Sequence, residues 1–271
     1  YFIRHPQIRE RAYIFISKGK AKDILNLMPP LERNSSTVLR NFTDIEISIR
    51  VTMKDLMEAF TSDISTAAIP WIEILEPEGE EDEKKTIPII KGTAIFKKGK
   101  MIDRINSKTT RGLLWLRDEI KLAVVTVEPK DAEGYVSMKL IKSTTQLIPE
   151  IDEKKWIITV KIETEDDIIA NASKLDVTDE KIVEMLEKKL REDLEKRIDL
   201  TLNKIQKEMK VDVFGFSEAF HRKYPKEWNE AKNQWDDIFP TIEVIYDTKA
   251  HVRRPGMVKN PAIIPDKEVE E

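Results

Sequence analysis

Residues 178–209 carry the longest periodic pattern in the chain, and this pattern limits the folds open to it. The segment is expected to form one helix, with Thr178 as its N-cap and acidic side chains in its first turn, where the helix dipole favours them. About 31 residues at a rise of 1.5 Å give a helix of about 46 Å. Its apolar side chains recur at three- or four-residue steps along one stripe: Ile182, Leu186, Leu190, Leu194, Ile198, Leu202 and Ile205.

A stripe of this length needs a second apolar surface to cover it. One alternative is a coiled coil, in which an identical stripe from another helix provides that surface. The other is a β-sheet beneath the helix, and repeated four-residue steps fit this arrangement better than the a and d positions of a coiled coil. We therefore expect the stripe to pack on a sheet.

Strand patterns on both sides of this helix supply such a sheet. Three runs rich in β-branched residues precede it, at 121–129, 135–149 and 154–164, and TIEVIYDTKAHVR (241–253) alternates apolar and polar residues after it. One or two short helices are expected from Ser217 to Asp237. These elements predict an α+β fold in which a mainly antiparallel sheet is covered by one long helix and shorter helices.

The N-terminal part of the chain has shorter patterns. Strands are expected at 10–17, 41–50, 69–75 and 86–102, and helices around 20–28, at 52–64 with Thr52 as N-cap, and at 111–120. The acidic stretch 76–85 between two of these strands should be a solvated loop, because its like charges repel one another. We predict two domains joined near Ile105 to Lys108: residues 1–108 form the remainder of an N-terminal region plus a middle domain, residues 109–260 form the C-terminal α+β domain, and residues 261–271 form a disordered tail.

Composition excludes several functional classes. The net charge of −4 gives no broad electrostatic reason to bind nucleic acid, and no apolar run approaches the roughly 20 residues that span a bilayer. With no cysteine, the chain has no disulfides, thiolate zinc sites or cysteine nucleophiles. Because it opens YFIRHPQIRE, without Met or a signal peptide, it is expected to be a fragment.

The stretch DVFGFSEAFHRKYPKEW (212–228) is the strongest candidate for an active site. Its GFSEA resembles the nucleophile motif G-x-S-x-G, with Ser217 as nucleophile and His221 four residues on, but Ala219 replaces the last glycine. A nucleophile elbow also needs a preceding strand, whereas a helix is predicted here. We expect Ser217 to be a helix N-cap, and the aromatic residues to pack in the core rather than to form a stacking platform for a ligand. They are Phe214, Phe216, Phe220, Tyr224, Trp228, Trp235 and Phe239.

Other chemistries lack their usual motifs. His5, His221 and His251 are far apart in sequence and form no metal-binding pattern, and the eight glycines form no phosphate-binding loop. We therefore expect no catalytic residue, no cofactor and no metal site, and the residues that contact a ligand or partner stay undefined. A binding or assembly role is what remains.

Three segments together resemble a known family. They are GTAIFKKGKMID (92–103), TRGLLWL (110–116) and residues 206–239, and they are similar to the Ger(x)C spore-germination proteins, the C subunits of nutrient germinant receptors. The matching residues are Gly92, Ala94 and Phe96, then Arg111 to Trp115, then Gln206, Asp212, Gly215, Phe216, Pro225, Trp228, Trp235 and Phe239, with Gly256 after the last strand. Ser217 stands where the family pattern has a third glycine, and the lipid-modified cysteine of the family is absent from this sequence.

The resemblance implies a non-catalytic receptor subunit that acts in assembly and signalling. Such a protein would be lipid-anchored on the outer face of the spore inner membrane, with the polytopic membrane subunits A and B as partners. The alternative function is an extracytoplasmic solute-binding module that itself binds the nutrient. The motif residues are expected to be structural, so none is assigned to a ligand.

Overall fold

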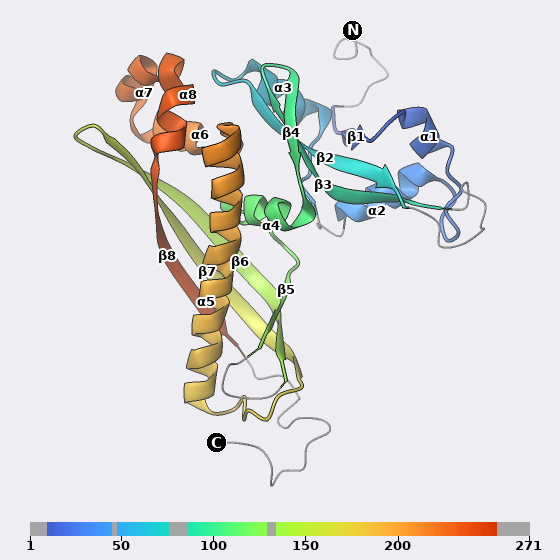
Figure 1. Cartoon of the computed structure of the whole chain (residues 1–271), viewed down its shortest axis with the longest axis vertical. Coiled ribbons are helices and arrows are strands. Elements are labelled where there is room, and N and C mark those ends of the chain that lie inside the picture. The colour runs from blue at the N-terminus through green and yellow to red at the C-terminus, as the bar shows by residue number, and fades with distance from the viewer. Residues whose placement is uncertain (1–9, 45–47, 76–85, 129–133, 254–271) are drawn as a thin grey trace.

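The computed structural model describes residues 10–44, 48–75, 86–128 and 134–253. Two four-stranded sheets make up most of it, with strand orders β1-β2-β3-β4 and β5-β6-β7-β8. In Figure 1 the first sheet lies with α1, α2 and α3 on one side of the molecule, and the second lies behind the long helix α5. This mixed architecture confirms the predicted α+β fold class.

The N-terminal sheet is built on one long hairpin. Strand β2 (Thr66–Ile74) pairs antiparallel with β3 (Pro88–Lys97), which pairs antiparallel with β4 (Lys100–Ile105), while β1 (Ile16–Ser17) adds two residues parallel to β2. The predicted strand at 86–102 is therefore two strands, which meet at Lys98 and Gly99, both with positive φ. The predicted strand at 10–17 is wrong except for its last two residues.

Short helices flank this sheet. Helix α1 spans Ala21–Leu25, and α2 (Ser35–Asp44) occupies part of the predicted strand at 41–50, which is therefore wrong there. Residues 45–47 lie outside the described residues, as do the acidic stretch 76–85 and the predicted tail 261–271. Leu39 and Phe42 of α2 pack in one cluster with Ile24 and Ile72, and a helix places these two side chains on that face.

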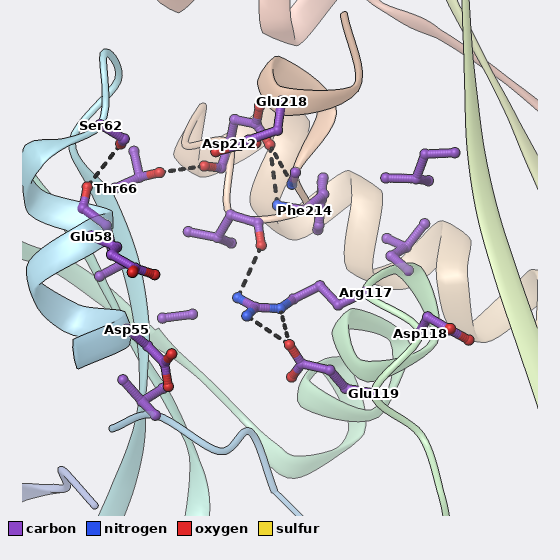
Figure 2. Close-up of a pocket in the computed structure, with 18 of the residues that line it drawn as sticks. Asp55, Glu58, Ser62, Thr66, Arg117, Asp118, Glu119, Asp212, Phe214 and Glu218 are labelled. Carbon is purple, nitrogen blue, oxygen red and sulfur yellow. Dashed lines mark hydrogen bonds and ion pairs between the residues drawn. The ribbon is translucent and has the colours of Figure 1, made fainter. Parts of the chain in front are cut away.

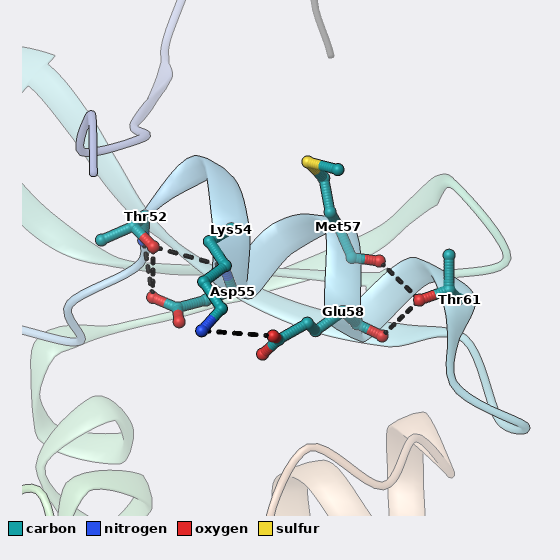
Figure 3. Close-up of polar contacts among 6 residues, drawn as sticks. All are labelled: Thr52, Lys54, Asp55, Met57, Glu58 and Thr61. Carbon is teal, nitrogen blue, oxygen red and sulfur yellow. Dashed lines mark hydrogen bonds and ion pairs between the residues drawn. The ribbon is translucent and has the colours of Figure 1, made fainter. Parts of the chain in front are cut away.

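Helix α3 (Met53–Thr61) begins as predicted at Thr52. Thr52 Oγ1 accepts from the amide of Asp55 at 3.2 Å and Asp55 Oδ2 accepts from the amide of Thr52 at 2.9 Å, a reciprocal capping box (Figure 3). At the other end Thr61 Oγ1 donates to the carbonyl oxygens of Met57 and Glu58, and the helix stops three residues before the predicted end at Ile64. The capping prediction is confirmed.

The C-terminal sheet contains two strands of 17 residues, β6 (Val136–Asp152) and β7 (Lys155–Asn171). They pair antiparallel, β5 (Val124–Val127) pairs antiparallel with β6, and β8 (Glu243–Val252) pairs parallel with β7. The sheet is mainly antiparallel, as predicted. The parallel pair arises because the chain leaves β7, passes through the helices and returns in the same direction.

Helix α5 (Glu180–Leu202) covers one face of this sheet and continues as a π-helix over Asn203–Met209. Six residues of the predicted stripe are at least nine-tenths buried and Ile182 is partly buried, so packing on the sheet is confirmed. The N-cap is Asp179, whose Oδ1 accepts from the amide of Lys181 at 2.7 Å, and not Thr178. Thr178 instead donates its amide and hydroxyl to Asp176, which places it in the preceding turn.

Helix α4 (Ser107–Leu116) lies between the two sheets (Figure 1). It packs closely on α5, because a Cβ at Gly112 would lie 2.0 Å from Thr201 Oγ1, and Thr201 Oγ1 in turn donates to the carbonyl of Thr109 at 3.0 Å. One hydrophobic cluster includes residues of both sheets and of α4. The predicted domain boundary at Ile105 to Lys108 falls between β4 and α4 and stays a prediction. Across the described residues, every helix is too short or too polar to cross a bilayer.

Candidate functional site

The aromatic residues of 212–239 form a packed corner beside the C-terminal sheet. Six of them are at most 2% exposed: Phe214, Phe216, Phe220, Trp228, Trp235 and Phe239. Their rings meet at tilted or edge-on angles, with a centroid separation of 4.9 Å between Trp228 and Trp235. The corner also receives Trp156 from β7, whose ring centroid lies 4.6 Å from that of Phe220. For these six residues the prediction of core packing is confirmed, while Tyr224 is only partly buried.

Asp212 organises this corner from within. Its carboxylate accepts from the amides of Phe214, Gly215, Phe216 and Ser217 at 2.8–3.3 Å and from Trp235 Nε1 at 3.1 Å. Gly215 has φ of 91°, which turns these amides inward and which a side chain would strain. The carboxylate therefore both caps α6 (Phe216–Lys223) and fixes the indole of α8 (Trp235–Ile238).

The same surroundings shift the ionisation of Asp212. Complete burial, together with the nearby carboxylate of Glu218, raises the pKa of Asp212 to about 6, while the bonds from the amides of Ser217 and Phe214 oppose this rise. The group is thus held in place by hydrogen bonds rather than poised for contact with solvent.

Ser217 and His221 do not form a catalytic pair. Ser217 is 2% exposed, its hydroxyl donates to Glu218 Oε2 at 2.8 Å, and no hydrogen bond joins it to His221 within the described part of the chain. The ring of His221 stacks on Trp228 at 5.9 Å. The prediction that Ser217 is the N-cap is also wrong, because Gly215 holds that position and Asp212 supplies the accepting oxygens.

A groove of about 910 Å³ opens beside Asp212, where the two sheets meet. One wall is α3, which contributes Asp55 and Glu58, and the opposite wall is the end of α4, with Arg117 and Glu119 (Figure 2). Residues 66–68 of β2, residues 145–148 of β6 and residues between 212 and 222 complete it. The groove is thus built from segments that lie far apart in the sequence.

Most polar groups of the groove already have partners. Arg117 Nε donates to Glu119 Oε1 at 2.7 Å, its Nη1 lies 3.5 Å from the carbonyl oxygen of Val213, and Asp118 Oδ1 accepts from the amide of Thr145 at 2.7 Å. Two buried atoms have none among the described residues: Glu119 Oε2 and Thr145 Oγ1. The lining as a whole mixes carboxylates with the guanidinium groups of Arg50, Arg117 and Arg222, which suits a polar or zwitterionic molecule better than an apolar one.

Sequence reasoning missed the groove residues, since no motif marks them and they come together only in the folded chain. Asp212 was identified from the sequence as a residue of the family pattern, but its position in the wall of the groove was not predicted. Within the described ranges, no three His, Asp or Glu side chains lie close enough to bind a metal ion.

The chain matches two models of known protein families. The model described as Spore germination B3/GerAC-like, C-terminal, matches residues 91–256, and the model described as Spore germination protein N-terminal domain matches residues 1–74. The chain belongs to this family of spore germination proteins. The resemblance inferred from the sequence is thereby confirmed.

Individual relatives agree with this assignment. Spore germination protein KC of Bacillus subtilis (strain 168) is 25% identical over 95% of this chain and 67% of its own length. Spore germination protein YndF of the same organism is 31% identical over 62% of this chain and 42% of its own length. The crystal structure of the GerBC protein superposes with a TM-score of 0.75 over 93% of this chain and 72% of that chain, at 19% identity, and shows the same fold. The chain thus spans about two thirds of KC and less of YndF.

Several family-pattern residues have structural roles in this chain. Gly92 has φ of 135° and a Cβ there would lie 1.9 Å from the carbonyl oxygen of Ile105, so the pairing of β3 with β4 requires glycine. Gln206 Nε2 donates to the carbonyls of Phe239 and Ile242 at 3.0 and 2.9 Å, and thus joins the end of the long helix to the segment before β8. These contacts give Gly92 and Gln206 structural roles, and neither role involves a ligand.

Proposed function

We propose that this spore germination protein is a non-catalytic subunit of a nutrient germinant receptor, which acts in assembly and signalling with membrane subunits A and B. The observation that carries the proposal is the family match, which takes in residues 1–74 and 91–256. The packed corner supports it, because Asp212 and Ser217 are engaged in structural hydrogen bonds. We further propose a lipid anchor on the outer face of the spore inner membrane, and a division into domains at Ile105 to Lys108.

Spores that lack this protein provide the test. They should fail to respond to one set of nutrients, measured as the fall in optical density during germination, while their response to other nutrients stays normal. Because a paralogue could replace the missing protein, the deletion is also made in a strain that lacks the paralogous C subunits, where it should abolish the nutrient response that this strain keeps. An unchanged nutrient response after the deletion in both strains would contradict the proposal.

The second candidate function is direct binding of the nutrient as an extracytoplasmic solute-binding module. The groove favours it, since its volume of about 910 Å³ is that of a small-molecule site and carboxylate and guanidinium side chains line it together, among them Glu119 and Arg117. A ligand at 100 times its Kd adds about 2.7 kcal/mol of stability. A thermal-shift screen with amino acids, sugars and nucleosides therefore separates the candidates: a shift that Glu119→Ala abolishes supports binding, and no shift with any nutrient supports assembly alone.

A further inference from the structure

Arg111 belongs to the family pattern, but the fold does not explain its charge. Unlike Gln206, its side chain has no hydrogen bond or ion pair with another described residue. Burial and the nearby guanidinium of Arg197 on α5 lower the pKa of Arg111, so two like charges lie close together. Cationic side chains are thus crowded where α4 packs on α5.

Further cations line the surface beside this contact. Two hollows of about 860 and 430 Å³ adjoin where β4, α4 and α5 meet, since Lys108 and Leu200 line both of them (Figure 1). Their lining on α5 and the π-helix runs from Asp193 to Lys204, about 15 Å, and we call the two hollows together the basic trough. Its lining cations outnumber its carboxylates by six to three: Lys91, Arg104, Lys108, Lys196, Arg197 and Lys204 against Glu73, Asp193 and Asp199.

The three carboxylates of the basic trough are already engaged. Their partners are Arg104 and Lys91 for Glu73, Arg197 for Asp193, and the hydroxyl of Tyr246 for Asp199. Lys108 and Lys196 are exposed and have no counterion within the described ranges. Lys204 pairs with Glu208 and Asp103, neither of which lines the hollows. The trough therefore carries excess positive charge, although the whole chain has a net charge of −4.

An exposed leucine lies where the two hollows meet. Leu200 is 47% exposed, whereas the other four leucines of α5 are at most 6% exposed. It can therefore contact an apolar group of a ligand whose neighbouring groups are negative. An elongated hollow with this arrangement fits an extended acidic peptide better than a bilayer, because lipid phosphates form a broad surface that does not enter a hollow.

We propose that the basic trough binds an extended acidic segment of a partner protein, with an apolar side chain of that segment over Leu200. This inference rests on the proposed assembly role and names the kind of segment that the partner presents. Carboxylates of the segment pair with Lys108 and Lys196, which lack counterions, and offset the repulsion between Arg111 and Arg197. Because these cations are largely exposed, each ion pair contributes little and binding weakens as the salt concentration rises.

Fluorescence anisotropy with labelled peptides tests the proposal on the 271-residue chain. The acidic peptide EDELEDE should bind with a Kd below about 1 mM at about 50 mM salt, and the neutral peptide QNQLQNQ at least about tenfold more weakly. Lys108→Glu/Lys196→Glu should weaken binding of EDELEDE by about tenfold or more, because it reverses both cations that lack counterions. Lys139→Glu/Lys155→Glu on the C-terminal sheet is the matched control, since it changes the net charge equally and should leave the Kd within about twofold. Urea unfolding checks that both double variants are folded.

Leu200→Gln tests the apolar contact. It should reduce the preference for EDELEDE over EDEGEDE by about threefold or more. No binding of EDELEDE up to about 1 mM protein, or an equal loss in the control variant, would overturn the proposal. Binding to phosphatidylglycerol vesicles in place of the peptide, if Lys108→Glu/Lys196→Glu abolishes it, would also overturn it and assign the trough to a lipid surface. These assays need only the purified chain, so their failure leaves the receptor proposal to the deletion test in spores.

Discussion

Replacing Asp212 with alanine should destabilise the protein more than any other single polar substitution in the aromatic corner. The change removes one carboxylate that accepts from four backbone amides and from the indole of Trp235. Each buried donor left without an acceptor costs about 1–3 kcal/mol, and removing the buried charge recovers part of that cost. We therefore expect a loss of about 3–5 kcal/mol in the free energy of unfolding.

Urea unfolding followed by tryptophan fluorescence measures this loss, because Trp228 and Trp235 report on the corner itself. Ser217→Ala is the matched control, since it removes one neutral hydroxyl, which donates to Glu218, and keeps the carboxylate of Asp212 and its bonds from the backbone amides, so it should cost less than about 1 kcal/mol. If Asp212→Ala costs no more than Ser217→Ala, the carboxylate does not hold the corner together and its role would have to be sought in the groove.

Three further predictions concern the helices and the sheet beneath α5. Leu194→Asp places a charge in the buried stripe and should unfold the C-terminal sheet, so unchanged melting would show that the stripe is not core. Gly112→Ala should cost about 2 kcal/mol or more, because its Cβ would lie 2.7 Å from the backbone oxygen of Arg197, and an unchanged urea midpoint would contradict the close packing of α4 on α5. Burial raises the pKa of Asp166 from 3.8 to about 6, so the native state binds the proton more tightly and stability is lost as pH rises from about 4 to 6. Asp166→Asn should therefore be more stable than the parent at pH 7, by on the order of 2–3 kcal/mol, with the gain shrinking toward pH 4, and a gain that does not change with pH would refute this cause.

The long helix and its sheet were predictable because their signals are local and repeated. The stripe from Ile182 to Ile205 keeps one period over many turns, and only a helix places all of those side chains on one face. The strand predictions failed where the pattern was short: the alternation at 41–50 begins inside α2, and packing of Leu39 and Phe42 against Ile24 decides its structure.

The candidate site was less predictable, for two physical reasons. Ser217 has the residue type and position of an N-cap, but the positive φ of Gly215 moves the start of α6 and lets Asp212 cap it from three residues before its N-cap. The groove lining comes from segments as distant as Asp55 and Glu218, and no local pattern brings them together. The functional class was predicted from the resemblance to the Ger(x)C family, and this resemblance rests on residues between Gly92 and Phe239.

The central proposal is that the corner containing Ser217 and His221 has a structural role. Its most direct test is complementation of spores lacking this protein with the Ser217→Ala/His221→Ala double variant, with germination measured in response to each nutrient. We predict that the double variant restores the response to the level of the parent protein, whereas Asp212→Ala, which lowers stability, does not. A double variant that is folded and present in spores at normal levels, yet restores no response, would contradict the claim.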